Sequence, residues 1–400
     1  PNPCTENRQS ETENRLPLIT PISSATMIKA WLKDNLKGDY QIWLIVFLLS
    51  VQSLLVVYSA TGTYAYKTMR STEFYLFKHG ILVVASLALM YVCHRLDYRY
   101  YARLSKLALW ASVILLLYAF ANGSKINEAN RWITIPVINQ TFQPSDLAKL
   151  ALITSLAAML AKRQHLKYDT QVLLPMVTWC ILICGCIALT NASTAILLLA
   201  TCFLLMFIGR VPMKFLALLV VGGLLIGGTA LAVGQRFGTV QKRVERFFDK
   251  KNVEFQTEQG YIAIVNGGIT GRGPGQSLQR NFLPHPYSDF IFAVIVEEYG
   301  LLGGLFTLFL YLWLLYRGMK AVANSDRAFG GLLSAGLSFS IVIQALINMA
   351  VATGLVPVTG LPLPLVSMGG TSLLFTGIAI GIILSVSREG APELKPARSE

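Results

Sequence analysis

Long apolar runs recur along the chain and limit what it can fold into. Runs of about 20 residues, enough for a helix to cross the hydrocarbon core of a bilayer, lie at about 42–60, 77–95, 104–121, 146–161, 172–190, 193–209, 213–233, 289–316, 329–353 and 369–386. With 54% hydrophobic and 14% charged residues, the 400-residue chain does not suit two or three soluble domains. We predict an all-α, polytopic integral membrane protein with about ten transmembrane helices in one domain, residues 42–388.

The basic residues indicate how this domain is oriented. The 34 Lys and Arg exceed the 21 Asp and Glu, and a net charge of +13 could suit nucleic acid, anionic lipid or an anionic substrate. Short connectors after the even-numbered runs are basic and carry Arg95, Arg99, Arg103, Lys162, Arg163, Lys167, Arg210, Lys214, Arg317, Lys320 and Arg327. By the positive-inside rule these connectors and both termini are cytoplasmic, so we expect no nucleic-acid partner.

Two terminal segments flank the membrane domain. Residues 1–41 form a polar N-terminal segment without the hydrophobic region of a signal peptide, and Met27 is the start that we expect. Residues 389–400 form a short tail. We expect both segments to be cytoplasmic.

The long connector at 234–288, between runs seven and eight, faces outward in this topology. It is basic all the same, with residues such as Arg236, Lys242, Arg243 and Arg246. It is either a solvated loop, since long loops translocate regardless of charge, or a basic lid over a phosphorylated substrate. Its glycine-rich stretch GITGRGPGQS has no surrounding βαβ unit, which favours turns or backbone donors for a lipid pyrophosphate over a nucleotide site.

Three carboxylates lie at the start of run eight or inside it. Asp289 could cap the helix that starts there, together with Ser288, or act as a half-buried general base. Glu297 and Glu298 lie about two turns further in, and acidic residues inside a membrane need partners. We predict a structural pairing for these two, with Lys149 as a candidate partner.

Two further segments carry polar or helix-breaking residues. In residues 130–150, Arg131 and Trp132 suit an interfacial anchor. Asp146 and Lys149, spaced i, i+3, could form an ion pair near a helix start. Alternatively, Lys149 and Arg131 face the phosphates of the substrate. Residues 354–374 contain Pro357, Pro362, Pro364, Gly360, Gly369 and Gly370, which predict a broken, re-entrant or cavity-lining segment.

Smaller signals complete the polar inventory. Gln344 and Asn348, one turn apart on run nine, predict either hydrogen bonds between helices or a substrate contact. The six Cys show no metal or disulfide spacing, which favours packing, and the sequence has no zinc motif or P-loop.

Several ordered blocks resemble one family. They are VVYSAT at 56–61, RWI and QPSDLAKL within 131–150, RVERFFD at 243–249, GGITGRGPGQS at 267–277, FLPHPYSDFIFAVIVEEYG at 282–300 and QALINMAVATGLVPVTGLPLPLVSMGGTSLL at 344–374. Over nearly all of residues 40–388 the chain resembles the SEDS family (shape, elongation, division and sporulation), the polytopic peptidoglycan glycosyltransferases typified by RodA and FtsW. The GRGPGQS and TGLPLPLVSMGG blocks look more like the FtsW branch, for division, than the RodA branch, for elongation.

The resemblance implies a lipid II polymerase at the outer face of the bacterial cytoplasmic membrane, a multi-pass protein without an organic cofactor. It implies partners as well: lipid II and undecaprenyl-linked glycan, a class B penicillin-binding protein as transpeptidase, and other divisome membrane proteins. A divalent cation, Mg²⁺ or Mn²⁺, could supplement the basic residues, held by pyrophosphate and one or two carboxylates; no metal ligands can be assigned.

The resemblance also implies roles for individual residues. The family's catalytic Asp falls on Asp289, which would take the proton from the acceptor's 4-hydroxyl while undecaprenyl pyrophosphate leaves the donor. Substrate-binding roles fall on Arg131, Lys149, Arg243, Gln259 and Ser367. Supporting roles fall on Trp132, Asp146, Glu297, Glu298, Gln344, Asn348, Pro364, Gly369 and Gly370.

The chain departs from the family pattern at a few positions. His285, Tyr287 and Ser288 stand where the family motif LPExHTDFIF has Glu, His and Thr, so these positions cannot perform indispensable chemistry if the chain is active. Asp146 replaces a usual Glu, and LTNASTA at 189–195 replaces a Pro-Asp-containing segment, which weakens contacts assigned there. Alternatives to the division polymerase are a RodA-type elongation polymerase, a lipid II flippase or other transporter, and a scaffold that activates its partner.

Overall fold

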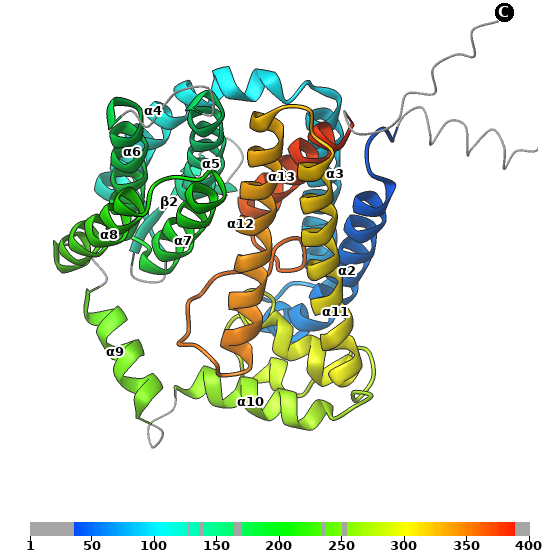
Figure 1. Cartoon of the computed structure of the whole chain (residues 1–400). Helices are drawn as coiled ribbons and strands as arrows, with labels where there is room; N and C mark the ends of the chain where they lie inside the picture. Colours follow the sequence, from blue (N-terminus) through cyan, green and yellow to red (C-terminus); the bar gives the residue numbers. More distant parts are fainter. Residues whose placement is uncertain are drawn as a thin grey trace, which may run out of the picture. The chain divides into compact units, whose positions relative to one another are not determined.

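The computed structural model describes residues 36–126, 129–135, 140–163, 170–233, 237–249 and 254–388 (Figure 1). The chain divides into residues 1–37 and a compact unit from residue 38 onward, and the following account concerns the second. Most of the predicted N-terminal segment 1–41, with Met27, and all of the tail 389–400 lie outside the described residues.

The elements are mostly helices. The helices are α2 (Tyr40–Lys67), α3 (Thr72–Arg95), α4 (Arg99–Asn122), α5 (Pro144–Arg163), α6 (Thr170–Ala188), α7 (Ala192–Ile208), α8 (Met213–Val233), α9 (Phe237–Phe248), α10 (Phe255–Gly267), the 3₁₀ turn η1 (Gln279–Asn281), α11 (Ile291–Ala323), α12 (Ala328–Ala352) and α13 (Thr371–Ser387). Each of the ten predicted apolar runs coincides with one of them, which confirms the fold class.

Of the helices in the described residues, seven are long and apolar enough to cross a membrane: α2, α3, α4, α5, α8, α11 and α12. Helices α6, α7 and α13 contain shorter apolar stretches. The protein is therefore a multi-pass membrane protein, while ten crossings remain a prediction.

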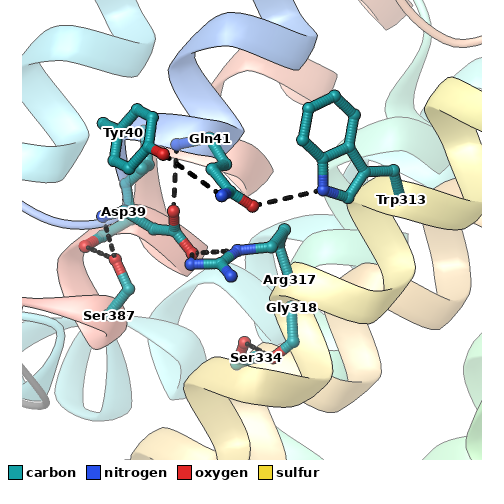
Figure 2. Close-up of polar contacts among 9 residues, drawn as sticks. Asp39, Tyr40, Gln41, Trp313, Arg317, Gly318, Ser334 and Ser387 are labelled. Carbon is teal, nitrogen blue, oxygen red and sulfur yellow. Dashed lines mark hydrogen bonds and ion pairs between the residues drawn. The ribbon is translucent and has the colours of Figure 1, made fainter.

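Helix α12 packs against α5, α7, α11 and α13 and forms much of the core. Its small residues allow this close approach. A β-carbon at Gly336 would lie 2.7 Å from Ile153 of α5, and Ser334 Oγ donates a hydrogen bond to Gly318 O of α11 (3.0 Å; Figure 2).

Helix α11 is broken at Gly300, where φ is 68°. The glycine-rich segment after α10 fills the break. The N–H groups of Arg272 and Gly273 donate to the carbonyls of Glu297 and Glu298 (both 3.0 Å). The N–H groups that follow the break, on residues 301 and 302, donate back to the carbonyls of residues 268 and 269 (2.9 and 3.3 Å). We call residues 267–273 the glycine latch.

The latch requires glycine because backbones touch there. A β-carbon at Gly271 would lie 2.2 Å from Glu298 O, and one at Gly300 would lie 2.2 Å from Ile269 O. Both residues have positive φ, which L side chains rarely adopt. The latch thus satisfies backbone groups that an interrupted helix would leave unpaired in the membrane.

Two connectors contain secondary structure that the sequence did not predict, and a third is non-helical as predicted. The long connector 234–288 contains helices α9 and α10 rather than loop alone. Residues 124–142 include a small antiparallel sheet in the order β1 (Ser124–Ile126), β2 (Ala129–Ile135), β3 (Gln140–Phe142). Residues 353–370 form no helix, as their prolines and glycines predicted, and yet several of their apolar side chains are buried.

Candidate active site

Asp289 lies just before α11 and is half-buried. Its carboxylate faces the non-helical segment 353–370, where a β-carbon at Gly360 would lie 3.9 Å from Asp289 Oδ2. Of the two alternatives for Asp289, the structure does not place it at the cap position: the N-cap residue of α11 is Phe290, whose side chain makes no cap hydrogen bond.

Hydrogen bonds from two elements fix the backbone around Asp289. Asn348 of α12 donates from Nδ2 to Asp289 O (2.9 Å) and to Leu361 O (2.7 Å). Ser367 Oγ donates to Ser288 O (2.6 Å), and Met368 N donates to Tyr287 O (2.9 Å). The carboxylate therefore stands on a backbone held by α12 and by segment 353–370.

Segment 353–370 is itself held by side chains of the surrounding helices. Four carbonyls of the segment accept their hydrogen bonds: Leu361 O from Asn348, Pro362 O from Gln344 (2.9 Å), Pro364 O from Tyr311 and Val366 O from Ser53 (2.8 Å). Non-helical backbone is tolerated at membrane depth when protein groups satisfy it. Of the two alternatives for Gln344 and Asn348, the structure thus shows hydrogen bonding within the protein, to this segment.

Asp146 and Lys149 form the predicted i, i+3 ion pair, with Lys149 Nζ 3.0 Å from Asp146 Oδ1. Lys149 Nζ also donates to Gln344 Oε1 (3.2 Å). Because Gln344 binds Pro362 O, the ion pair is linked through α12 to the segment that faces Asp289. Both ionic groups line a pocket between α5, α12 and α13.

The expected pairing of Glu297 and Glu298 with Lys149 is wrong. Glu297 accepts from Ser277 Oγ (2.5 Å) and from the N–H groups of Leu278 and Gln279 (3.0 and 3.3 Å). Glu298 accepts from Ser59 Oγ and from Ser277 N (3.4 Å). Lys149 is instead paired with Asp146, three residues earlier in its own helix α5. The two buried glutamates anchor the segment after the latch.

The other predicted substrate-binding residues outside segment 353–370 lie in three different elements. Arg243 of α9 donates from Nη1 to Val358 O (3.0 Å), which brings its charge to the segment that carries Gly360. Arg131 lies in β2, and its side chain is outside the described part of the chain. Gln259 is half-buried on α10, next to Gly260, where a β-carbon would lie 3.1 Å from the Phe290 ring.

The remaining supporting residues surround these groups. Trp132 is half-buried in β2. Pro364 and Ser367 belong to the bonded part of segment 353–370, and Gly369 and Gly370 end it, with Gly370 at positive φ (56°) as the residue before α13.

The departures from the family motif contact one another. His285 Nδ1 lies 3.2 Å from Tyr287 OH, and the Tyr287 ring packs edge-on against Tyr64. Burial raises the pKa of Tyr287, and Tyr64, Tyr75 and Asp289 raise it further. The phenol therefore stays protonated at neutral pH.

The sequence analysis missed some residues of this site. Ser53 and Tyr311 lie inside apolar runs, as does His79, whose Nε2 lies 2.7 Å from Ser53 Oγ. His79 and Ser53 are buried. A buried polar residue inside a membrane helix was the available signal, but its partner could not be read from the sequence.

Comparisons with known proteins identify the family. Residues 39–391 match the family described as "Cell cycle protein", whose members are FtsW, RodA and SpoVE. The chain is 34% identical over 362 residues to the "Probable peptidoglycan glycosyltransferase FtsW" of Geobacter metallireducens, covering 89% of this chain and 96% of that protein. It is 31% identical over 360 residues to the "Stage V sporulation protein E" of Bacillus subtilis, covering 88% and 97%. The chain belongs to the FtsW/RodA/SpoVE family.

Solved structures share the fold. The chain matches Thermus thermophilus RodA with a TM-score of 0.66 and 24% identity, covering 91% of this chain and all of RodA. It also matches a chain from a structure titled "Structural coordination of polymerization and crosslinking by a peptidoglycan synthase complex", with a TM-score of 0.69 and 24% identity over 89% of this chain and 99% of that one.

Proposed function

We propose that this protein is a peptidoglycan glycosyltransferase that polymerises lipid II for septal wall synthesis in cell division. The observation that carries the proposal is Asp289, a half-buried carboxylate whose backbone is fixed by Asn348 and whose side chain faces Gly360. A general base needs this combination of fixed position and access to substrate. Family membership and the names of the FtsW relatives support the reaction class.

In the proposed reaction, Asp289 accepts the proton of the 4-hydroxyl of the acceptor's GlcNAc. The oxygen forms a bond to the anomeric carbon of the donor's MurNAc, the bond from that carbon to pyrophosphate breaks, and the configuration inverts. Undecaprenyl pyrophosphate leaves with the electron pair. Cationic groups would stabilise the charge that develops on it.

Arg243 is the best-placed cation for that role, because it binds the carbonyl of Val358, two residues before Gly360. Lys149, Arg131, Gln259 and Ser367 complete the proposed substrate contacts. No group of three or more His, Cys, Asp or Glu side chains in the described residues is arranged to hold a metal ion. We propose that Mg²⁺ or Mn²⁺, where used, would be held mainly by the pyrophosphate oxygens and one or two carboxylates and would supply positive charge there.

The distribution of basic residues supports an outward-facing site in the cytoplasmic membrane. Asp289 precedes the start of α11, and the opposite end of α11 leads into the basic connector with Lys320 and Arg327. By the positive-inside rule that connector is cytoplasmic. This supports a position of Asp289 on the outer side and of both termini in the cytoplasm.

We also propose a class B penicillin-binding protein as partner, among other divisome membrane proteins. One structural relative comes from a complex whose title names polymerisation and crosslinking. In this chain, α10 and the segment after it expose apolar side chains, including Val265, Ile269 and Phe282. Exposed apolar side chains outside the spans suit a protein interface.

The test is lipid II polymerisation by the purified protein, with and without the class B penicillin-binding protein. Asp289→Ala should yield no glycan, whereas Asp326→Asn, a control at an exposed carboxylate after α11, should polymerise at the wild-type rate. Polymer from a folded Asp289→Ala variant would remove Asp289 from the mechanism. Failure of the wild type to make polymer while it binds its partner would favour a flippase or a scaffold instead.

A further inference from the structure

A cavity of about 200 Å³ lies at the far end of α11 from Asp289, where α11 ends beside the start of α2 and the end of α13 (Figure 2). Its lining includes two basic side chains, one carboxylate and three smaller polar groups: Arg317, Lys320, Asp39, Tyr40, Asn324 and Ser387. The stretch of α11 from Gly300 to Arg317 alone is about 26 Å long at 1.5 Å per residue. The cavity therefore lies near the other membrane boundary and is separate from the proposed active site.

Arg317 is held rigidly in this cavity. Its Nε lies 2.5 Å from Asp39 Oδ2, its Nη2 contacts the same oxygen, and the two side chains are only 14% and 9% exposed. Asp39 is fixed in turn, because its Oδ1 accepts from Gln41 N (2.9 Å) and its own N–H donates to Ser387 Oγ (3.1 Å; Figure 2). A guanidinium has five N–H donors, so this pair leaves Arg317 with donors for a ligand.

The charge balance of the cavity favours an anion. Asp39 offsets Arg317. Lys320, exposed one helical turn further along α11, adds a positive charge that no second carboxylate of the lining offsets. The ends of α11 and α13 bring carbonyl groups of negative partial charge to the same place. At α11 that effect is reduced, because the N–H of Asn324 donates to the carbonyls of Lys320 and Val322.

Exposed apolar side chains lead away from the cavity along two adjacent helices. On α2 they are Leu44 and Phe47, and on α11 they are Phe309, Leu312 and Tyr316. The helices are joined beside the cavity by the hydrogen bond from Trp313 Nε1 to Gln41 Oε1 (3.2 Å; Figure 2). A basic polar cavity at a membrane boundary, continued by apolar faces within the membrane, matches the two parts of a phospholipid.

We propose that this cavity binds the phosphate headgroup of an anionic phospholipid, with the acyl chains along the exposed faces of α2 and α11. Lys320 and the remaining donors of Arg317 contact the phosphate oxygens, and the Asn324 amide and Tyr40 hydroxyl bind the rest of the headgroup. Basic pockets between membrane helices on the cytoplasmic side are suited to such headgroups. The bound lipid ties together the ends of α2, α11 and α13.

The test is native mass spectrometry of the full chain, titrated with phosphatidylglycerol and, separately, with phosphatidylcholine of the same acyl chains. We expect the wild type to retain phosphatidylglycerol preferentially. Lys320→Gln should weaken that binding about fivefold, the factor expected for one basic group near an anionic lipid, and Lys320→Arg should restore it. The control Lys214→Gln removes an exposed lysine of another basic connector and should change binding less than twofold.

Three results would overturn the proposal. Equal retention of the two lipids by the wild type would show that the cavity does not select an anionic headgroup. An equal loss of binding in Lys214→Gln and Lys320→Gln would show a general surface effect instead of a site. If inorganic phosphate alone raised the thermal unfolding midpoint as much as phosphatidylglycerol does, the ligand would be a free phosphate ion and not a lipid.

Discussion

Replacing Gly300 by Ala should separate the half of α11 that follows Asp289 from the latch that holds it. The alanine β-carbon would lie 2.2 Å from Ile269 O and 2.4 Å from Gly271 N, and these are backbone atoms that cannot rotate away. The backbone of residue 300 (φ 68°, ψ −170°) lies in a region that is essentially restricted to glycine and would cost a residue with a side chain about 1–3 kcal/mol. The latch must therefore open or distort.

An opened latch loses four backbone hydrogen bonds, those at 3.0, 3.0, 2.9 and 3.3 Å that span the break. At roughly 0.5–1.5 kcal/mol each, their loss amounts to about 2–6 kcal/mol. A straightened α11 would regain part of this, including about 1 kcal/mol for Ala over Gly in a helix. We expect a net destabilisation of about 1–5 kcal/mol.

The substitution should also slow the reaction. Straightening α11 reorients its first nine residues and moves Asp289, and a misplacement of about 1 Å can cost about 100-fold in rate. The assay is lipid II polymerisation beside thermal unfolding in the same detergent. Gly227→Ala in α8 is the control, since a β-carbon there meets nothing within 4 Å. Wild-type stability and rate in Gly300→Ala would refute the argument.

Other variants test single contacts. Asn348→Leu removes two hydrogen bonds to carbonyls and should destabilise the protein by about 2–4 kcal/mol and slow polymerisation, and unchanged unfolding and rate would contradict the account of the site. Glu297→Gln and Glu298→Gln should lower the unfolding midpoint and retain turnover; loss of turnover in stably folded variants would show that these carboxylates take part in the reaction. Because burial raises the pKa of Tyr287, Tyr287→Phe should leave the pH dependence of polymerisation across the neutral range unchanged, and a shifted pH profile would mean that the phenol ionises there.

Features that depend on local composition could be predicted from the sequence. The apolar runs identify the helices because length and hydrophobicity suffice for a membrane helix. The prolines and glycines of residues 354–374 predicted a broken segment because they prevent continuous helical hydrogen bonding, and residues 353–370 are non-helical. The spacing of Asp146 and Lys149 predicted their ion pair, since residues at i, i+3 share a helix face.

Features that depend on distant partners could not be predicted. The break at Gly300 lies in an uninterrupted apolar run, and the hydrogen bonds that stabilise it come from residues 268–273. The pairing of Glu298 with Lys149 failed for the same reason, because its actual partner Ser59 lies on α2. An acidic residue inside an apolar run is expected to need a partner, but the sequence does not specify which helix supplies that partner.

The most direct test of the central claim compares wild type and Asp289→Asn for lipid II binding and for glycan formation in the same preparation, with the class B penicillin-binding protein present. The substitution preserves the size of the side chain and removes its capacity to accept the proton. The account predicts wild-type affinity for lipid II and no detectable glycan. Glycan formation by Asp289→Asn at the wild-type rate would contradict the assignment of Asp289 as the general base.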